Sequence, residues 1–415
     1  MKKILSFVLV LSMLLGGCMV SAHAEDVELN FWTWRTEDVD FYNAVIADFE
    51  AANPGIKVKQ EAFKNTDYNT LLSAALKDNS GAPDVFMSRA YGGLQTYTDS
   101  GYVAALDELV PNIKEFPATA LKGATSITDG KIYGVPVASQ TVFCFYNKKL
   151  YAELGLEVPT TWSAFIENNK KAKEAGHIAL ANGTADGWTN ETLFGGVAPS
   201  FYGGEEFFEK LVKGETNFND PVFVNAVAKM YELAEFMPEM YEGVKYEDMR
   251  NNFVEELAVH FIGGSYEAGF LQNENKDLEF GMFAIPAEDG KAIVSVYADA
   301  NFSMAESTQH KEEALKFLNF LASKEFGEKI AKELKMISSV PGIDVSGDQY
   351  IQDVLKLQEN ATSYLFLVGF RYEQPTGSSL VQSTSQEMMV GKITAEQMCA
   401  EIQKGIEAYY KPFQK

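Results

Sequence analysis

The sequence predicts an α/β protein with two domains, the first of which is doubly wound. The chain has 415 residues, and the roughly 390 that follow its apolar N-terminal segment exceed what one hydrophobic core usually covers. Near the start, strand and helix patterns alternate in the order β-α-β-α-β, which is typical of a parallel sheet covered by helices. Hydrophobic residues make up 46% of the chain, enough for well-filled cores.

The first strand is predicted over residues 27–34, where apolar and polar residues alternate and aromatic residues are frequent. Asp38 is expected to cap the helix that follows, and Asn53, Pro54 and Gly55 end that helix. The apolar residues of this helix share one face: Phe41, Val45, Ile46 and Phe49.

The next three elements complete the doubly wound pattern. A strand is predicted over 56–59, a helix over 68–76 and a third strand over 83–87. Ligands of such sheets bind at the carboxyl ends of the strands, on the loops that lead into helices. Those loops are 32–37 and 88–94, so we expect the binding site to include them.

The second half of the chain repeats strand and helix patterns without an intervening linker. The predicted elements are strands over 142–146, 257–262 and 279–285, helices from about 161 onward, and amphipathic helices over 311–322 and 394–409. Repeats, low-complexity tracts and Ser/Gly-rich linkers are absent from the sequence after the N-terminal segment. We therefore expect the two domains to pack closely, with several short crossings between them.

The first 24 residues are predicted to be an export signal, because two lysines precede the short apolar run Ile4–Leu15. The end of the signal has two interpretations. Leu15-Gly16-Gly17-Cys18 is similar to a bacterial lipobox, in which cleavage occurs before Cys18 and that residue carries lipid. Ala22-His23-Ala24 fits ordinary cleavage after Ala24, which would release a soluble protein. Either way, we expect the mature protein to work outside the cytoplasm.

Composition excludes several classes of partner and cofactor. A net charge of −23 disfavours nucleic acid and anionic lipid as partners. No other apolar run approaches the roughly 18 residues that a membrane span requires. Neither metal-binding spacings nor phosphate-binding loops occur, so we expect no metal and no cofactor. Cys144 and Cys399 are expected to be buried free thiols, with a disulfide between them left open.

Seven short segments occur in one order along nearly the whole mature chain: Leu29–Trp34, Tyr97–Tyr102, Asp129–Pro136, Tyr146–Leu150, Pro159–Trp162, Gly263–Phe270 and Gly391–Thr394. Together they resemble the extracellular solute-binding proteins of ABC sugar importers, the family that includes maltose-binding protein. The family usually has Trp where this chain has Tyr266, so its ring offers a smaller stacking face.

The resemblance implies two doubly wound α/β lobes of the type II periplasmic-binding-protein class, joined by a hinge. Each lobe would be discontinuous, residues 25–137 with 296–345 forming the N-terminal lobe and residues 138–295 with 346–415 the C-terminal lobe. It further implies a monomer that closes around a sugar or oligosaccharide and delivers it to ABC permease subunits. The protein would lie at the cell surface or in the periplasm.

The candidate site residues follow from what a sugar requires: aromatic rings for its apolar face and planar polar groups for its hydroxyls. Trp32 and Trp34 alternate along a strand, so only one of them can face the cleft, and we favour Trp34. Trp162 at a helix start is expected to be structural. The predicted ligand contacts are Trp34, Arg35, Arg89, Tyr91, Trp188, Tyr266, Glu267, Arg371 and Tyr372.

Arginine is scarce in this chain and concentrated in these loops. Of its 35 basic residues only four are arginines, and Arg35, Arg89 and Arg371 fall in loops assigned to the cleft, whereas Arg250 does not. Arginine is favoured over lysine where a planar fork must meet fixed acceptors. One interpretation is an anionic sugar, such as a uronate or a sialylated glycan. The other is arginine paired with cleft carboxylates or with neutral hydroxyls.

The competing functional class is a secreted glycoside hydrolase, which would also carry aromatic residues and paired carboxylates. The segment Gly263–Glu267 fails the G-x-S-x-G pattern of a nucleophile elbow at its last position. The absence of a phosphate-binding loop assigns ATP hydrolysis to a partner protein. The order of the seven segments favours a binding protein over an enzyme.

Overall fold

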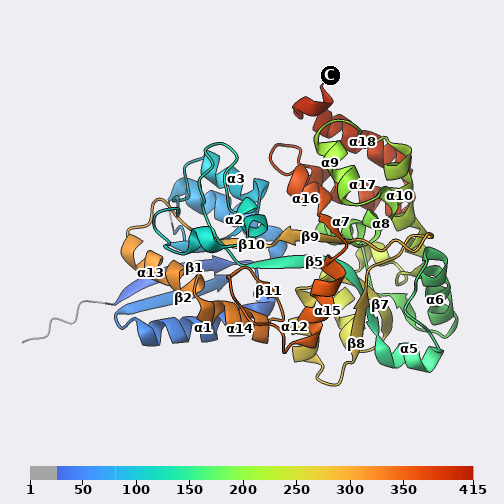
Figure 1. Cartoon of the computed structure of the whole chain (residues 1–415), viewed down its shortest axis with the longest axis horizontal. Helices are drawn as coiled ribbons and strands as arrows, with labels where there is room; N and C mark the ends of the chain where they lie inside the picture. Colours follow the sequence, from blue (N-terminus) through green and yellow to red (C-terminus); the bar gives the residue numbers. More distant parts are fainter. Residues whose placement is uncertain (1–25, 80, 415) are drawn as a thin grey trace, which may run out of the picture.

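The computed structural model of the protein describes residues 26–79 and 81–414 and folds them into two α/β lobes, each built on one sheet. Figure 1 shows the first lobe at the left and the second at the right, with β5 and β9 running between them. The predicted export signal, including Cys18, lies outside the described residues. Within the described residues, no helix is long and apolar enough to cross a membrane.

The sheet of the first lobe has five strands in the order β2-β1-β3-β10-β4. Its strands are β1 (Val27–Thr33), β2 (Ile56–Ala62), β3 (Val85–Arg89), β4 (Val135–Pro136) and β10 (Ala300–Met304). β1 pairs in parallel with β2 and β3, as the β-α-β-α-β pattern predicts. β10 comes from much later in the chain and pairs antiparallel to β3 and β4.

Amphipathic helices cover this first sheet. They are α1 (Val39–Ala52), α2 (Asn65–Asp78), α3 (Gly92–Asp99), α4 (Ala118–Lys122), α13 (Lys311–Leu321) and α14 (Lys324–Glu333). Phe31 of β1 lies at the centre of the core and packs against the rings of Tyr42, Phe302 and Phe317. Asp38 precedes α1 as predicted but makes no side-chain capping bond. Its carboxylate accepts a hydrogen bond from Arg35 instead.

The second sheet has seven strands: β12-β9-β5-β7-β6 in order, with β8 and β11 also pairing with β5. The strands are β5 (Ala138–Asn147), β6 (Ile178–Leu180), β7 (Ala258–Gly264), β8 (Phe280–Phe283), β9 (Val294–Ala298), β11 (Ile337–Ser338) and β12 (Ala361–Ser363). Neighbouring residues of β5 point to opposite faces of the sheet. Val142 and Cys144 enter one core, whereas Phe143 and Phe145 enter the other.

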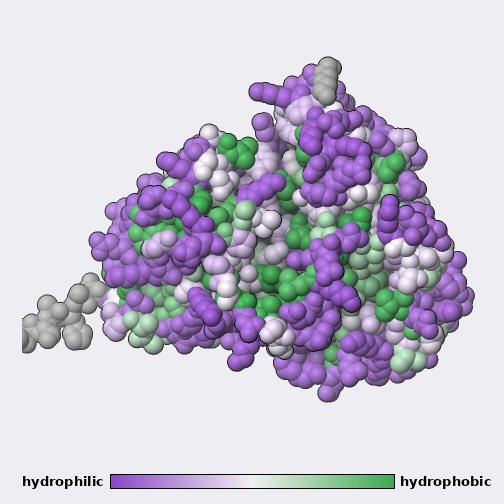
Figure 2. Space-filling view, viewed as in Figure 1, coloured by the Kyte–Doolittle hydropathy of each residue, from purple (hydrophilic) through white to green (hydrophobic). Residues whose placement is uncertain are grey.

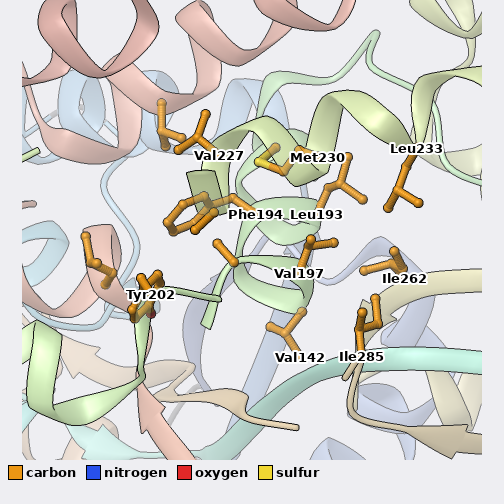
Figure 3. Close-up of a cluster of buried hydrophobic side chains, with 14 of the residues drawn as sticks. Val142, Leu193, Phe194, Val197, Tyr202, Val227, Met230, Leu233, Ile262 and Ile285 are labelled. Atoms are coloured by element: carbon orange, nitrogen blue, oxygen red, sulfur yellow. The ribbon is translucent and has the colours of Figure 1, made fainter. Parts of the chain in front are cut away.

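Helices cover the two faces of the second sheet. They are α5 (Lys148–Leu154), α6 (Trp162–Glu174), α7 (Gly187–Val197), α8 (Pro199–Tyr202), α9 (Glu205–Val212), α10 (Pro221–Glu232), α11 (Tyr246–Val254), α12 (Glu267–Glu274), α15 (Gln349–Gln358), α16 (Leu365–Gly369), α17 (Gly377–Met389) and α18 (Ala395–Glu407). Figure 3 shows α7 at the centre of one core, with Phe194 and Val197 buried among residues of the sheet and of α10. This packing fixes the N-terminus of α7, which carries Trp188.

Three chain segments cross between the lobes and lie side by side. The amide of Val137 donates to Ala300, the amide of Asp299 to Ala138, and the amide of Ser339 to Val137. The predicted boundary at residue 296 needs correction, because β9 pairs with the second sheet as far as Ala298. The second crossing therefore falls at Asp299.

Figure 2 shows mostly hydrophilic residues over the lobes on this face, with apolar residues among them.

Cys144 and Cys399 are buried and free, and burial raises the pKa of each thiol. Trp162 is buried in the second lobe, where its indole Nε1 donates to Glu232 at 2.8 Å.

Candidate ligand-binding cleft

A cavity of about 480 Å³ lies between the lobes, and residues of each lobe line it. Its size falls within the range of pockets that hold small ligands. The first lobe contributes the loop after β1, the end of β3 and the start of α2, which are carboxyl-end positions of the parallel sheet. The second lobe contributes the starts of α7 and α11, the turn after β7, and the chain that follows α16.

Six of the nine predicted contact residues line this cavity: Trp34, Arg35, Arg89, Trp188, Tyr266 and Arg371. The structure places the other three elsewhere. The hydroxyl of Tyr91 accepts a hydrogen bond from the amide of Ala298 at 3.0 Å, and Tyr91 lines a second cavity. Tyr372 packs against the core of the second lobe. Glu267 is 1% exposed and lies behind the cavity wall.

Glu267 supports a residue that does line the cavity. Its Oε1 accepts a hydrogen bond from the hydroxyl of Tyr246 at 2.9 Å, whereas its Oε2 is buried without a hydrogen-bond partner. Burial raises the pKa of Glu267 to about 7, although the charge of Arg250 and the bond from Tyr246 act in the opposite direction. We correct its predicted role from ligand contact to support of Tyr246.

Trp34 faces the cavity, but another residue covers its ring. The guanidinium carbon of Arg89 lies 3.6 Å from the ring centroid, and Tyr68 packs against the ring at 5.3 Å. Trp34 is 4% exposed, so Arg89 rather than the indole is presented to the cavity. Trp32, the alternate residue of the strand, packs against Phe63 and does not line the cavity.

The aromatic surface of the cavity comes from the second lobe. Besides the predicted Trp188 and Tyr266, it includes three residues that sequence reasoning missed: Tyr246, Tyr297 and Tyr364. Trp188 and Tyr246 meet edge to face, with centroids 4.6 Å apart. A Cβ on Gly264 would lie 2.0 Å from Cε1 of Tyr266, so the glycine before this turn lets the ring fold back over the strand.

Arg35 lies at the centre of a cluster of acidic side chains in the first-lobe wall of the cavity. Its Nε donates to Asp38 at 2.5 Å, and it lies 3.6 Å from both Glu37 and Asp299. Asp299 also accepts from Gln140 at 3.1 Å. Burial raises the pKa of Asp38 to about 6, against the opposing charge of Arg35. The cluster links the loop after β1 to a crossing between the lobes.

All four arginines of the chain line the cavity. Arg250 is the one that sequence reasoning left out, because it lies on a helix rather than at a strand end. Its guanidinium carbon lies 4.2 Å from the ring of Tyr246 and 4.0 Å from that of Phe270. The scarcity of arginine was the signal that could have found it.

Comparison with known proteins decides the family. Residues 33–328 match the sequence profile of the bacterial extracellular solute-binding proteins. The chain belongs to this family. A multiple sugar-binding protein of Streptococcus mutans is 24% identical over 88% of this chain and 89% of its own length. The resemblance drawn from the seven segments is thereby confirmed.

Solved structures confirm the fold of this solute-binding protein. A chitin oligosaccharide binding protein aligns with a TM-score of 0.80 at 20% identity, over 93% of this chain and 99% of its own. A sugar transporter protein of Bacillus licheniformis in complex with stachyose aligns with a TM-score of 0.74 at 18% identity, over 93% and 100%. The two-lobed type II architecture is therefore established, and no comparison supports the glycoside hydrolase alternative.

Proposed function

We propose that this solute-binding protein captures a sugar or oligosaccharide between its lobes and delivers it to the permease of an ABC transporter. The cavity between the lobes is the observation that carries the proposal, because it combines aromatic rings with planar polar groups. Rings match the apolar face of a sugar, and amide, carboxylate and guanidinium groups match its hydroxyls. The relatives named for sugar and chitin oligosaccharide binding support it.

The contacts that we propose are the cavity-lining residues Arg35, Arg89, Trp188, Tyr266 and Arg371, extended by Tyr246, Arg250 and Tyr297. Trp34 supports Arg89, and Tyr364 packs against Tyr297. The proposed lobes are 25–137 with 299–345 and 138–298 with 346–415, hinged at the three crossings. A sugar that touches each lobe favours the closed state over the open one. Small-angle scattering at saturating ligand should show a smaller radius of gyration, and an unchanged radius would argue against closure.

Binding without catalysis is the second part of the proposal. A thermal-shift screen over neutral and acidic mono- and oligosaccharides should raise the melting temperature with the correct ligand, because only the folded state binds it. The same sugars, recovered after incubation and analysed by chromatography, should be intact. Release of shorter products would make the protein an enzyme. No melting shift with any sugar would count against sugar binding itself.

The cellular setting that we propose is a monomer anchored at the outer face of the membrane through a lipid on Cys18, where the permease lies. Cys18→Ala should then release the protein from the cell envelope, as fractionation and immunoblotting would detect. A native N-terminus at Glu25 without lipid, found by mass spectrometry, would establish cleavage after Ala24 and a soluble protein instead.

A further inference from the structure

The acidic and the basic side chains of the cleft differ in how many of their polar atoms have partners within the protein. Its acidic residues mostly have partners: Asp186 accepts from the amide of Tyr246, and Glu191 accepts from Ser378 and Gln382. Glu37 and Asp299 face Arg35. These carboxylates thus bind groups of the protein itself. Glu247 is the exception, since the structure gives no hydrogen bond or ion pair between its side chain and any other described residue.

Three of the four arginines of the cleft, in contrast, have buried donors without acceptors. Among the described residues, Nη2 of Arg35, Nε of Arg89, and Nε and Nη1 of Arg250 are buried and have no hydrogen-bond partner. Among the described carboxylates near the cleft, only Oε2 of Glu267 is likewise buried without a partner, and Glu267 does not line the cavity. A buried donor without an acceptor costs roughly 1–3 kcal/mol or more when charged. The cleft is therefore matched to a ligand that supplies acceptors.

Arg89 and Arg371 face the cavity from opposite lobes. Arg89 ends β3, stacks on Trp34 and donates to Asn65. Arg371 follows α16, and its backbone carbonyl lies so close to α3 that a Cβ on Gly92 would approach within 2.0 Å. Neither arginine forms an ion pair with a carboxylate in the described part of the chain. Glycine at position 92 thus permits the contact that brings these cationic side chains to one cavity.

Besides burial, Arg371 is one of the causes that lower the pKa of Arg89, which is what two positive charges near each other produce. Burial, followed by the positive charge of Arg371, lowers the pKa of Arg89 to about 10, with Asp299 acting in the opposite direction. Two such positive charges repel one another, and an anion bound between them removes that repulsion. An anion held by the two side chains would replace repulsion between the lobes by attraction and so favour closure.

We propose that the sugar bound in this cleft carries a carboxylate, as a uronic acid residue does, and that Arg89 and Arg371 bind that carboxylate from opposite lobes. The inference rests on the proposed function of sugar capture. A carboxylate suits the planar fork of arginine and brings a single negative charge. A phosphate brings more charge, and Glu37, Glu191 and Glu247 in the same lining would repel it more strongly.

Calorimetric titration with matched ligands tests the proposal. The probes are uronic acid oligosaccharides of one to four residues and the same oligosaccharides after chemical reduction of their carboxyl groups. N-acetylneuraminic acid and a sugar phosphate complete the set. We expect binding of a uronate ligand at least about 30-fold tighter than its reduced, neutral partner, the scale of losing one partner of a desolvated charge pair.

Variants connect this preference to the two arginines. Arg89→Gln and Arg371→Gln should each weaken uronate binding by about 30-fold or more and binding of the neutral partner by less than about threefold. Lys77→Gln, which removes one exposed charge of the first lobe outside the cleft, should leave both affinities unchanged. Arg371→Gln is informative even if Arg89→Gln fails to fold, because Arg371 is half-buried and makes no hydrogen bond in the described chain.

The outcomes separate this inference from the function on which it rests. Equal or tighter binding of the neutral partner would overturn the carboxylate proposal and leave sugar capture intact. A preference for the sugar phosphate would overturn the carboxylate proposal. A preference for N-acetylneuraminic acid would support a bound carboxylate and change only the class of sugar that carries it. Tight uronate binding that survives both arginine changes would overturn the residue assignment. Failure to bind any sugar would overturn the proposed function as well.

Discussion

The two walls of the cleft are built from different side chains. The first lobe presents charged and amide groups, with Trp34 as its aromatic residue, and Arg89 covers that ring. The second lobe presents the rings of Trp188, Tyr246, Tyr266 and Tyr297, with charges among them, and the buried ring of Tyr364 packs against Tyr297. The first wall is thus tied together by ion pairs and stacking, whereas the second offers apolar faces. Under the proposed sugar binding, we expect the first wall to orient the sugar through polar groups and the second wall to provide most of its apolar contact.

The largest expected effect concerns the ion-pair cluster of the first wall. Arg35→Met should lower the free energy of unfolding by about 3–5 kcal/mol, because it leaves buried Asp38 without its partner. Urea denaturation measures the loss. Lys64→Met, an exposed change in the same wall, is the control and should stay within about 0.5 kcal/mol. A loss below about 1 kcal/mol for Arg35→Met would show that the cluster does not stabilise this wall.

Removal of a ring from the second wall should weaken binding rather than folding. Trp188→Ala and Tyr266→Ala should each cost about 1–3 kcal/mol of sugar affinity by calorimetry, because each loses a large aromatic contact. Tyr231→Ala, at a ring 50% exposed on α10 outside the cleft, is the matched control. Wild-type affinity in both cleft variants would move the binding surface away from the second wall.

Protonation of Glu267 should make the stability of the second wall depend on pH. Its folded-state pKa of about 7 exceeds the ordinary value of 4.5, so the folded protein retains a proton that the unfolded chain releases. Stability from this group is therefore lost as the pH rises from about 4.5 to about 7. Glu267→Gln should stabilise the protein by on the order of 1–3 kcal/mol at pH 8 and much less at pH 4.5.

Glu267→Gln retains an acceptor for the hydroxyl of Tyr246, so the hydrogen bond behind the wall is kept. Melting curves of the variant and the wild type between pH 4.5 and pH 8 measure this difference in stability. An equal difference at every pH would show that the pKa of Glu267 is the same in the folded and unfolded states, against the expectation from its burial.

The smallest expected effect returns to the covered ring of the first wall. Trp34→Phe keeps a ring beneath Arg89, and the covered face cannot stack on a sugar, so sugar affinity should change by less than about 0.5 kcal/mol. Calorimetry with the sugar found in the screen measures it. A loss as large as that of Tyr266→Ala would mean that Arg89 moves aside on binding, and the contrast between the walls would then fail.

The carboxyl-end loops were predictable from the sequence because local patterns specify them. The alternation along 27–34 and the helical periodicity after it determine where β1 ends, and so place Trp34 and Arg35 at the edge of a parallel sheet. Arg89 follows from the end of β3 in the same way. Trp188 and Tyr266 were found as aromatic residues in polar or glycine-flanked turns.

What a side chain contacts once it reaches the cleft depends on segments distant in the chain. Tyr91 follows Arg89 by two residues but has φ of 58° and bonds to Ala298 at a lobe crossing. Glu267 follows Tyr266 directly, yet turns inward to Tyr246. Arg250, Tyr297 and Tyr364 carry no local signal of a site and converge because the second lobe folds around β5.

The sequence by itself determined the β-α-β-α-β order that begins the first lobe, the family and the loops that form the first wall, and it predicts an export signal at the N-terminus. Each of these is encoded in short-range periodicity or in short segments in fixed order. Only the tertiary structure decided which arginines have carboxylate partners, which rings are open, and that all four arginines share one cavity. Those properties depend on burial and long-range packing, which no local pattern encodes.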